Sequence, residues 1–164
     1  MKATGIVRKI DDLGRVVIPK EIRRVLRIRE NDSLEIYTDD GGKVILKKYS
    51  PVLELGQFAD EYAETASSVT GCTVIISDTD HIIAVSGGRK KDLLGKAIDN
   101  ELDKIIQTKS KYISNRKIII PIVSNGDPIG SIMIISKEET RALGEMETLT
   151  AEIGARFLAK QIDN

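Results

Sequence analysis

The sequence predicts an α+β protein made of two small domains, residues 1–50 and 51–164. Three observations support this. The first 50 residues alternate like strands on either side of a short helical segment. The stretch Tyr49-Ser50-Pro51 is typical of a domain boundary. The remaining residues follow the order helix, two strands, helix, three strands, helix, which indicates a mostly antiparallel sheet with helices packed on it.

The first domain begins with two short β-rich runs. "GIVRKI" at 5–10 and "RVVI" at 15–18 alternate as strands do, and a turn at 11–14 joins them. Pro19 has no N–H for a ladder and suits the first turn of a helix, which we expect over 19–28. "LEIYT" and "KVILKKY" then form a second hairpin around Asp39-Asp40-Gly41-Gly42.

Fifty residues bury too little surface to fold robustly alone, and the segment contains no cysteine. We therefore expect an obligate dimer in which hairpins from two chains complete one β-barrel. In the expected helix, Ile22, Val25 and Leu26 lie opposite the basic side chains and are expected to be buried against the strands.

The second domain contains longer elements. A 3.6-residue apolar period predicts a helix over 52–70, which Gly71 ends, and a closing helix over 137–164. Between them lie apolar strand patterns and a helical stretch. The strands are "CTVIISD", "HIIAVSGG", "YIS", "RKIIIPIVS" and "IGSIMIIS", and the helical stretch spans 91–108, with an interruption near 97–99.

The total charge of zero conceals a difference between the domains. Residues 1–50 carry 12 Lys and Arg against 8 Asp and Glu, whereas residues 51–164 carry 13 against 17. Lys20, Arg23, Arg24 and Arg27 share one stripe of the expected helix. A guanidinium group binds phosphate or guanine with two parallel hydrogen bonds, so this pattern favours nucleic-acid binding over a solvated basic face.

The segments "GIVRKIDDLGRVVIP", "EIRR" and "VILKKY" resemble the AbrB-type DNA-binding domain of bacterial transition-state regulators. With the second domain included, the chain resembles the AbrB/SpoVT family of transcription regulators. The resemblance implies a swapped-hairpin dimer that contacts double-stranded DNA. The matching motif positions are Arg8, Arg15, Arg23 and Arg24, with Lys9 inside the first motif and with Lys2 and Arg27 only as basic neighbours.

The same resemblance implies a cytoplasmic, nucleoid-associated regulator of sporulation (forespore) genes, acting as both repressor and activator. Residues 118–136, "IIIPIVSNGDPIGSIMIIS", resemble the final hairpin of a GAF domain, a ligand-sensing fold. No residue in this domain identifies a ligand, although an unknown small-molecule effector is compatible with the fold. Cys72 and His81 do not fit a chromophore or haem site. "SGGRKK" at 86–91 is interpreted as a loop leading into a helix rather than a phosphate cradle.

The apolar stripes of the helices at 52–70 and 137–164 predict a further association. The first helix follows a dimeric module, so pairing these helices between chains would join two dimers into a homotetramer. We expect no enzyme, cofactor, metal site or membrane partner, since no catalytic motif, His/Cys cluster or long apolar run occurs.

Two alternative functions remain open from the residues. One is an antitoxin-type autoregulator, in which a similar DNA-binding half precedes a toxin-binding segment. The other is a ligand-sensing module that does not bind DNA and whose basic half contacts a protein or a membrane surface.

Overall fold

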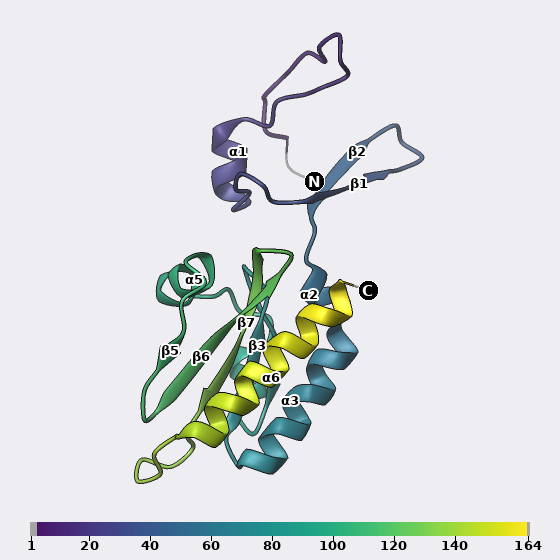
Figure 1. Cartoon of the computed structure of the whole chain (residues 1–164). Helices are drawn as coiled ribbons and strands as arrows, with labels where there is room; N and C mark the ends of the chain where they lie inside the picture. Colours follow the sequence, from purple (N-terminus) through teal and green to yellow (C-terminus); the bar gives the residue numbers. More distant parts are fainter. Residues whose placement is uncertain (1–2, 164) are drawn as a thin grey trace. The chain divides into compact units, whose positions relative to one another are not determined.

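The computed structural model describes residues 3–163 and divides the chain into two compact units, residues 1–49 and 50–164 (Figure 1). The division falls between Tyr49 and Ser50, one residue before the boundary expected from the sequence. Each unit has its own secondary structure and is described separately.

The N-terminal unit contains a short helix and a hairpin. Helix α1 spans Lys20–Val25, strand β1 spans Leu34–Thr38 and strand β2 spans Val44–Lys48. The two strands pair antiparallel, with Leu34 opposite Lys48 and Thr38 opposite Val44, which confirms the second hairpin.

The first hairpin differs from its prediction. Residues 5–10 and 15–18 form no regular strand within one chain, although the turn between them closes through a 3.0 Å hydrogen bond from Asp11 N to Arg15 O. Strands need a neighbouring strand to complete their ladders, and none of the described strands pairs with these segments. Residues 3–49 therefore form no closed barrel in one chain.

Helix α1 is shorter than expected. It ends at Val25 because Arg27 adopts a left-handed backbone conformation with φ of 53°, and Ile28 N donates back to Arg23 O at 2.8 Å. The expected burial of its apolar face is also absent in one chain, since Val25 is 76% exposed and Leu26 54% exposed. The side chains that would cover this face are not supplied by residues 3–49.

The C-terminal unit is a five-stranded antiparallel sheet with helices on both faces. The strand order is β4-β3-β7-β6-β5. The strands are β3 (Thr73–Ser77), β4 (Ile82–Ser86), β5 (Tyr112–Ile113), β6 (Lys117–Ser124) and β7 (Asp127–Ile135). The helices are α2 (Pro51–Glu54), α3 (Gly56–Thr70), α4 (Lys90–Leu93), α5 (Asn100–Gln107) and α6 (Glu145–Ile162). The expected order of elements is confirmed.

Two apolar clusters hold these layers together. Helices α3 and α6 run side by side over one face of the sheet (Figure 1). Ala59, Ala155 and Leu158 from these helices pack on the buried strand residues Ile120 and Ile132. On the other face, Leu102 and Ile106 of α5 pack against Ile75, Val85 and Ile119. Small side chains on the helices let them approach the sheet closely.

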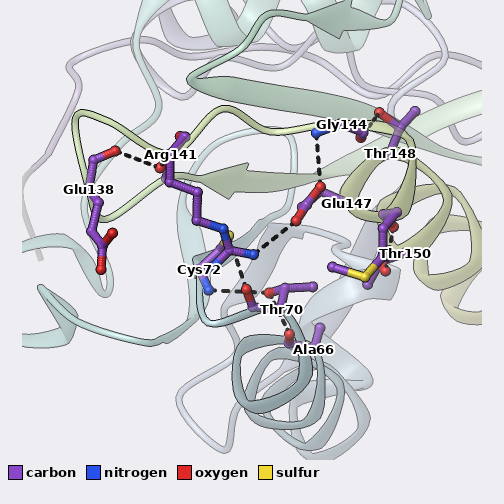
Figure 2. A network of polar contacts seen from close by, with 11 residues as sticks. Ala66, Thr70, Cys72, Glu138, Arg141, Gly144, Glu147, Thr148 and Thr150 are labelled. Atoms are coloured by element: carbon purple, nitrogen blue, oxygen red, sulfur yellow. Dashed lines mark hydrogen bonds and ion pairs between the residues drawn. The ribbon is translucent and has the colours of Figure 1, made fainter.

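Both long helices differ from their predicted bounds. The first is divided at Leu55 into α2 and α3, and α3 ends at Gly71 with φ of 69°, as expected. The last begins at Glu145 rather than at residue 137. Residues 137–144 form a loop because the Glu147 carboxylate accepts a hydrogen bond from Gly144 N at 2.9 Å and one from Arg141 Nη2 at 3.1 Å (Figure 2). Glu147 thereby fixes the helix start.

Among the described residues, no helix is both long enough and apolar enough to span a membrane.

Candidate nucleic-acid interface

The structure places the expected DNA-contacting residues on three successive elements of the N-terminal unit, all of them exposed. Arg8 and Lys9 lie on the first extended segment, and Arg15 follows the turn at 11–14. Arg23 and Arg24 form the basic last turn of α1. Cationic side chains near a helix C-terminus are stabilised by the helix dipole. The five side chains are thus available to an anionic partner.

Arg15 is held by a carboxylate. Its Nε donates to Asp11 Oδ2 at 2.7 Å, and its backbone N donates to Asp11 Oδ1 at 2.8 Å. The backbone N–H of Arg15 and then its guanidinium hold the pKa of Asp11 below its usual value. The side chain of Arg15 is still 70% exposed. The sequence placed a turn at residues 11–14 but did not predict this contact, because the i, i+4 rule for acid and arginine pairs applies to helices and residues 11–15 form none.

Arg8 and Arg23 donate side-chain hydrogen bonds to backbone carbonyl groups. Arg23 Nε donates to Ile18 O at 3.2 Å, which ties the end of the extended segment to α1. Arg8 Nη1 donates to the neighbouring Val7 O at 3.2 Å. No ion pair to a described residue neutralises Arg8, Arg23 or Arg24, so each presents a full positive charge. Arg27, beyond the helix end, is also exposed, whereas Lys2 lies outside the described residues.

A large apolar surface accompanies these cations. Val7, Ile10, Val17, Ile36 and Val44 are each more than two thirds exposed in the single chain. Pro19 is the one buried residue among residues 3–49. Exposed apolar area of this extent marks an association surface.

One pocket of the C-terminal unit is small. Its volume is about 190 Å³ and it lies between β6 and α6, lined by Lys111, Ile120, Pro121, Val123, Glu152, Ala155 and Arg156. The Lys111–Glu152 ion pair closes part of it. Cavities that enclose drug-sized molecules have volumes of roughly 300–1,000 Å³. The described residues contain no group of His, Cys, Asp and Glu placed to bind a metal ion.

Comparison with known proteins decides the family. The model of the family "Stage V sporulation protein T C-terminal, transcription factor" matches residues 54–163. The chain is 51% identical to stage V sporulation protein T of Bacillus subtilis, over 99% of both chains. The chain belongs to the stage V sporulation protein T family. The expectation of a transcription regulator of this family is thereby confirmed.

The N-terminal half has further relatives. It is 52% identical to the transition state regulatory protein AbrB of Bacillus subtilis over 77 residues, which cover 47% of this chain and 78% of that protein. The model "Antidote-toxin recognition MazE, bacterial antitoxin" matches residues 7–54 only. The whole-length match to the sporulation protein outweighs this partial one.

The fold of the C-terminal unit is that of a GAF domain. The GAF domain of a phosphoenolpyruvate-protein phosphotransferase from Acinetobacter superposes with a TM-score of 0.58 at 9% identity, over 68% of this chain and 88% of that one. This likeness confirms the predicted fold class and carries no ligand with it.

Proposed function

We propose that the chain binds double-stranded DNA through the N-terminal units of two subunits and regulates sporulation genes in the cytoplasm as repressor and activator. Arg8, Arg15, Arg23 and Arg24 contact the duplex, with Lys9 beside them. The observation that carries the proposal is the placement of these exposed cations on an N-terminal unit whose apolar residues are uncovered in a single chain.

The uncovered apolar residues support a dimer. A unit with Pro19 as its one buried described residue has too little core to be stable, since burial of apolar side chains is the main stabilising contribution to folding. The extended segments at 5–10 and 15–18 also have unpaired backbone groups. A second chain that interleaves its hairpins satisfies both requirements and completes the expected swapped-hairpin barrel. It also repeats the arginines across a two-fold axis.

A second association surface lies on the C-terminal unit. One face of α6 presents Met146, Leu149, Ile153 and Phe157, which are between 41% and 65% exposed. The Phe157 ring meets the ring of Phe58 on α3 edge to face at 6.4 Å. This apolar stripe supports the bundle of helices that would join two dimers into a homotetramer. Light scattering that gives a stable dimer at micromolar concentration would refute the tetramer.

Several weakly selective DNA contacts in one assembly gain affinity through avidity. The N-terminal unit has no long recognition helix, since α1 contains six residues. We therefore propose that DNA shape and flexibility contribute to selection, with a preference for A·T-rich sites. An unknown small-molecule effector of the GAF-like unit is a further part of the proposal, and native mass spectrometry of the purified protein would show a retained molecule.

The alternatives have less support. An antitoxin reading requires a toxin-binding tail, whereas residues 50–163 form a folded unit with two apolar clusters. A sensing module without DNA binding leaves the exposed arginines without a role.

A mobility-shift series on matched A·T-rich and G·C-rich duplexes tests the proposal. Binding should weaken steeply as salt is raised. Arg15→Ala should weaken it by roughly 1–3 kcal/mol, the value of a good bidentate base contact. Equal affinity for the two duplexes would exclude the A·T preference, and an unchanged affinity of the variant would exclude Arg15 from the site.

A further inference from the structure

We infer that Asp11 is a positioning residue for Arg15 that raises sequence discrimination at the expense of nonspecific affinity. The inference rests on the proposed DNA binding and adds to it a residue with negative charge. A carboxylate beside a DNA-contacting cation repels phosphate, so its presence there needs a reason. The geometry of the turn supplies one.

The Asp11 carboxylate fixes both the backbone and the side chain that follow it. Oδ1 accepts hydrogen bonds from Leu13 N at 3.0 Å and Arg15 N at 2.8 Å, and Oδ2 accepts one from Arg15 Nε at 2.7 Å. Gly14 closes the turn with φ of 75°, which glycine adopts without strain. The guanidinium is therefore held at one nitrogen, while no hydrogen bond to a described residue engages its two terminal nitrogens.

This arrangement separates two roles of an arginine. A bidentate contact to guanine uses two N–H donors in a fixed plane, and the two terminal nitrogens provide them. A phosphate contact depends mainly on net charge, and the Asp11–Arg15 pair has a formal net charge of zero. Arg15 is thus preorganised to read a base edge, whereas the unpaired Arg8, Arg23 and Arg24 provide the attraction to phosphate. Preorganisation lowers the entropy lost on binding.

The chain contains a second copy of the same turn. "DDLGR" at 11–15 and "DDGGK" at 39–43 share their pattern. Asp39 Oδ1 accepts from Gly41 N and Lys43 N, and Oδ2 accepts from Lys43 Nζ at 2.7 Å. Gly42 has φ of 70°. The second turn ends in lysine, which lacks the guanidinium fork. It therefore provides a matched control within the same domain.

The experiment compares Asp11→Asn with Asp39→Asn in the full chain. An asparagine side-chain oxygen still accepts the backbone hydrogen bonds of the turn, but the ion pair is lost. The probes are a duplex selected from a random 25-base-pair library by the wild-type protein and a scrambled duplex of equal composition. Fluorescence anisotropy gives both affinities between 50 and 200 mM salt, and circular dichroism checks folding.

For Asp11→Asn we expect tighter binding to the scrambled duplex and a salt slope steeper by up to about 0.9 for each subunit in contact. The ratio of the two affinities should fall at least about fivefold, since a bidentate base contact contributes roughly 5- to 150-fold discrimination. Asp39→Asn should leave this ratio within about twofold. If Asp11 acts through Arg15, Asp11→Asn should not change the ratio in an Arg15→Ala background.

The inference would be overturned if Asp11→Asn left the ratio of selected-duplex to scrambled-duplex affinity unchanged. It would also be overturned if Asp39→Asn lowered this ratio as much as Asp11→Asn does. If Asp11→Asn loses helix signal, Arg15→Lys replaces it, because lysine keeps the charge and loses the fork. If Arg15→Lys binds the scrambled duplex as tightly as wild type but has a reduced ratio of the two affinities, the inference is supported. If Arg15→Lys keeps the wild-type ratio, the inference is overturned. Wild-type protein that binds neither duplex would instead refute the proposed function itself.

Discussion

The ring of Tyr62 on α3 occupies the space that the missing side chain of Gly154 leaves on α6. A Cβ atom at Gly154 would overlap the Tyr62 ring, and the phenolic hydroxyl donates a hydrogen bond to Thr150 O one turn earlier on α6. Burial raises the pKa of Tyr62 to about 12, so it remains protonated and a donor at neutral pH. This contact sets how closely the two helices pack over the sheet.

Gly154→Ala should therefore destabilise the C-terminal unit by about 1–3 kcal/mol, the usual cost of overpacking. Scanning calorimetry of the full chain at fixed protein concentration measures the effect. Gly56, the first residue of α3, is the control because a Cβ there meets nothing within 4 Å. Gly56→Ala should be neutral or stabilising by up to about 1 kcal/mol. Equal effects at the two glycines would contradict the role of Tyr62.

The start of α6 should be sensitive to acid. Burial raises the pKa of Glu147, but the N–H groups of Gly144 and of Glu147 itself and the Arg141 guanidinium lower it by more, so the pKa lies below its ordinary value of 4.5. A lowered pKa in the folded state means that the charged carboxylate stabilises the fold above pH 4.5. That stability is lost as the pH falls through the folded-state pKa.

Glu147→Gln should consequently be less stable than wild type at pH 7. The difference in free energy of unfolding between the two proteins should become smaller below about pH 4.5. Urea unfolding at several pH values measures the gap. Comparing the two proteins cancels the titration of other carboxylates such as Asp11 and Glu152. A gap that stays constant from pH 7 to pH 3.5 would contradict the assignment.

The N-terminal apolar surface should be required for assembly. Val17 is 71% exposed in the single chain and should be covered by the partner subunit. Val17→Asp should therefore reduce dimerisation and DNA binding together, because a charge would be buried in the interface. Ile113 on β5, which is 57% exposed, is the control, and Ile113→Asp should change neither property. Sedimentation equilibrium that shows an intact dimer for Val17→Asp would place the interface elsewhere.

The stripe on α6 should control the step from dimer to tetramer. Ile153 is 65% exposed, and Ile153→Glu should yield dimers that keep their DNA-binding domains but lose avidity on long duplexes. Lys160→Glu changes the charge of an exposed residue on the same helix and should leave the mass unchanged. Multi-angle light scattering measures the mass of the assembly. If Ile153→Glu still formed tetramers, this face of α6 would be excluded as the tetramer interface.

Local patterns in the sequence predicted most of the fold. The second hairpin, the stop at Gly71 and the strand pair around Asn125 and Gly126 follow from turn chemistry and alternation, which act over a few residues. The first hairpin differs, because residues 5–10 and 15–18 alternate like strands but form no strand ladder in one chain. The late start of α6 depends on the capping contacts of Glu147, whose partner Arg141 lies outside the helix.

The candidate site was predicted from motif positions rather than from geometry. Sequence placed Arg8, Arg15, Arg23 and Arg24 on strand, turn and helix, and the structure leaves all of them exposed. The contact of Asp11 with Arg15 could not be predicted from the sequence, because turn formation alone explains an aspartate before a glycine turn. Only the 2.7 Å contact to Arg15 Nε distinguishes the two roles.

The most direct test of DNA binding by the N-terminal arginines is the affinity of the full chain and of its Arg8→Ala/Arg15→Ala/Arg23→Ala/Arg24→Ala variant for one labelled 30-base-pair duplex. Measured by fluorescence anisotropy from 50 to 200 mM salt, wild type should bind with an affinity that falls steeply with salt. The variant should show no measurable binding while its circular dichroism and mass stay those of wild type. A variant that binds as tightly as wild type, with the same salt dependence, would contradict the account.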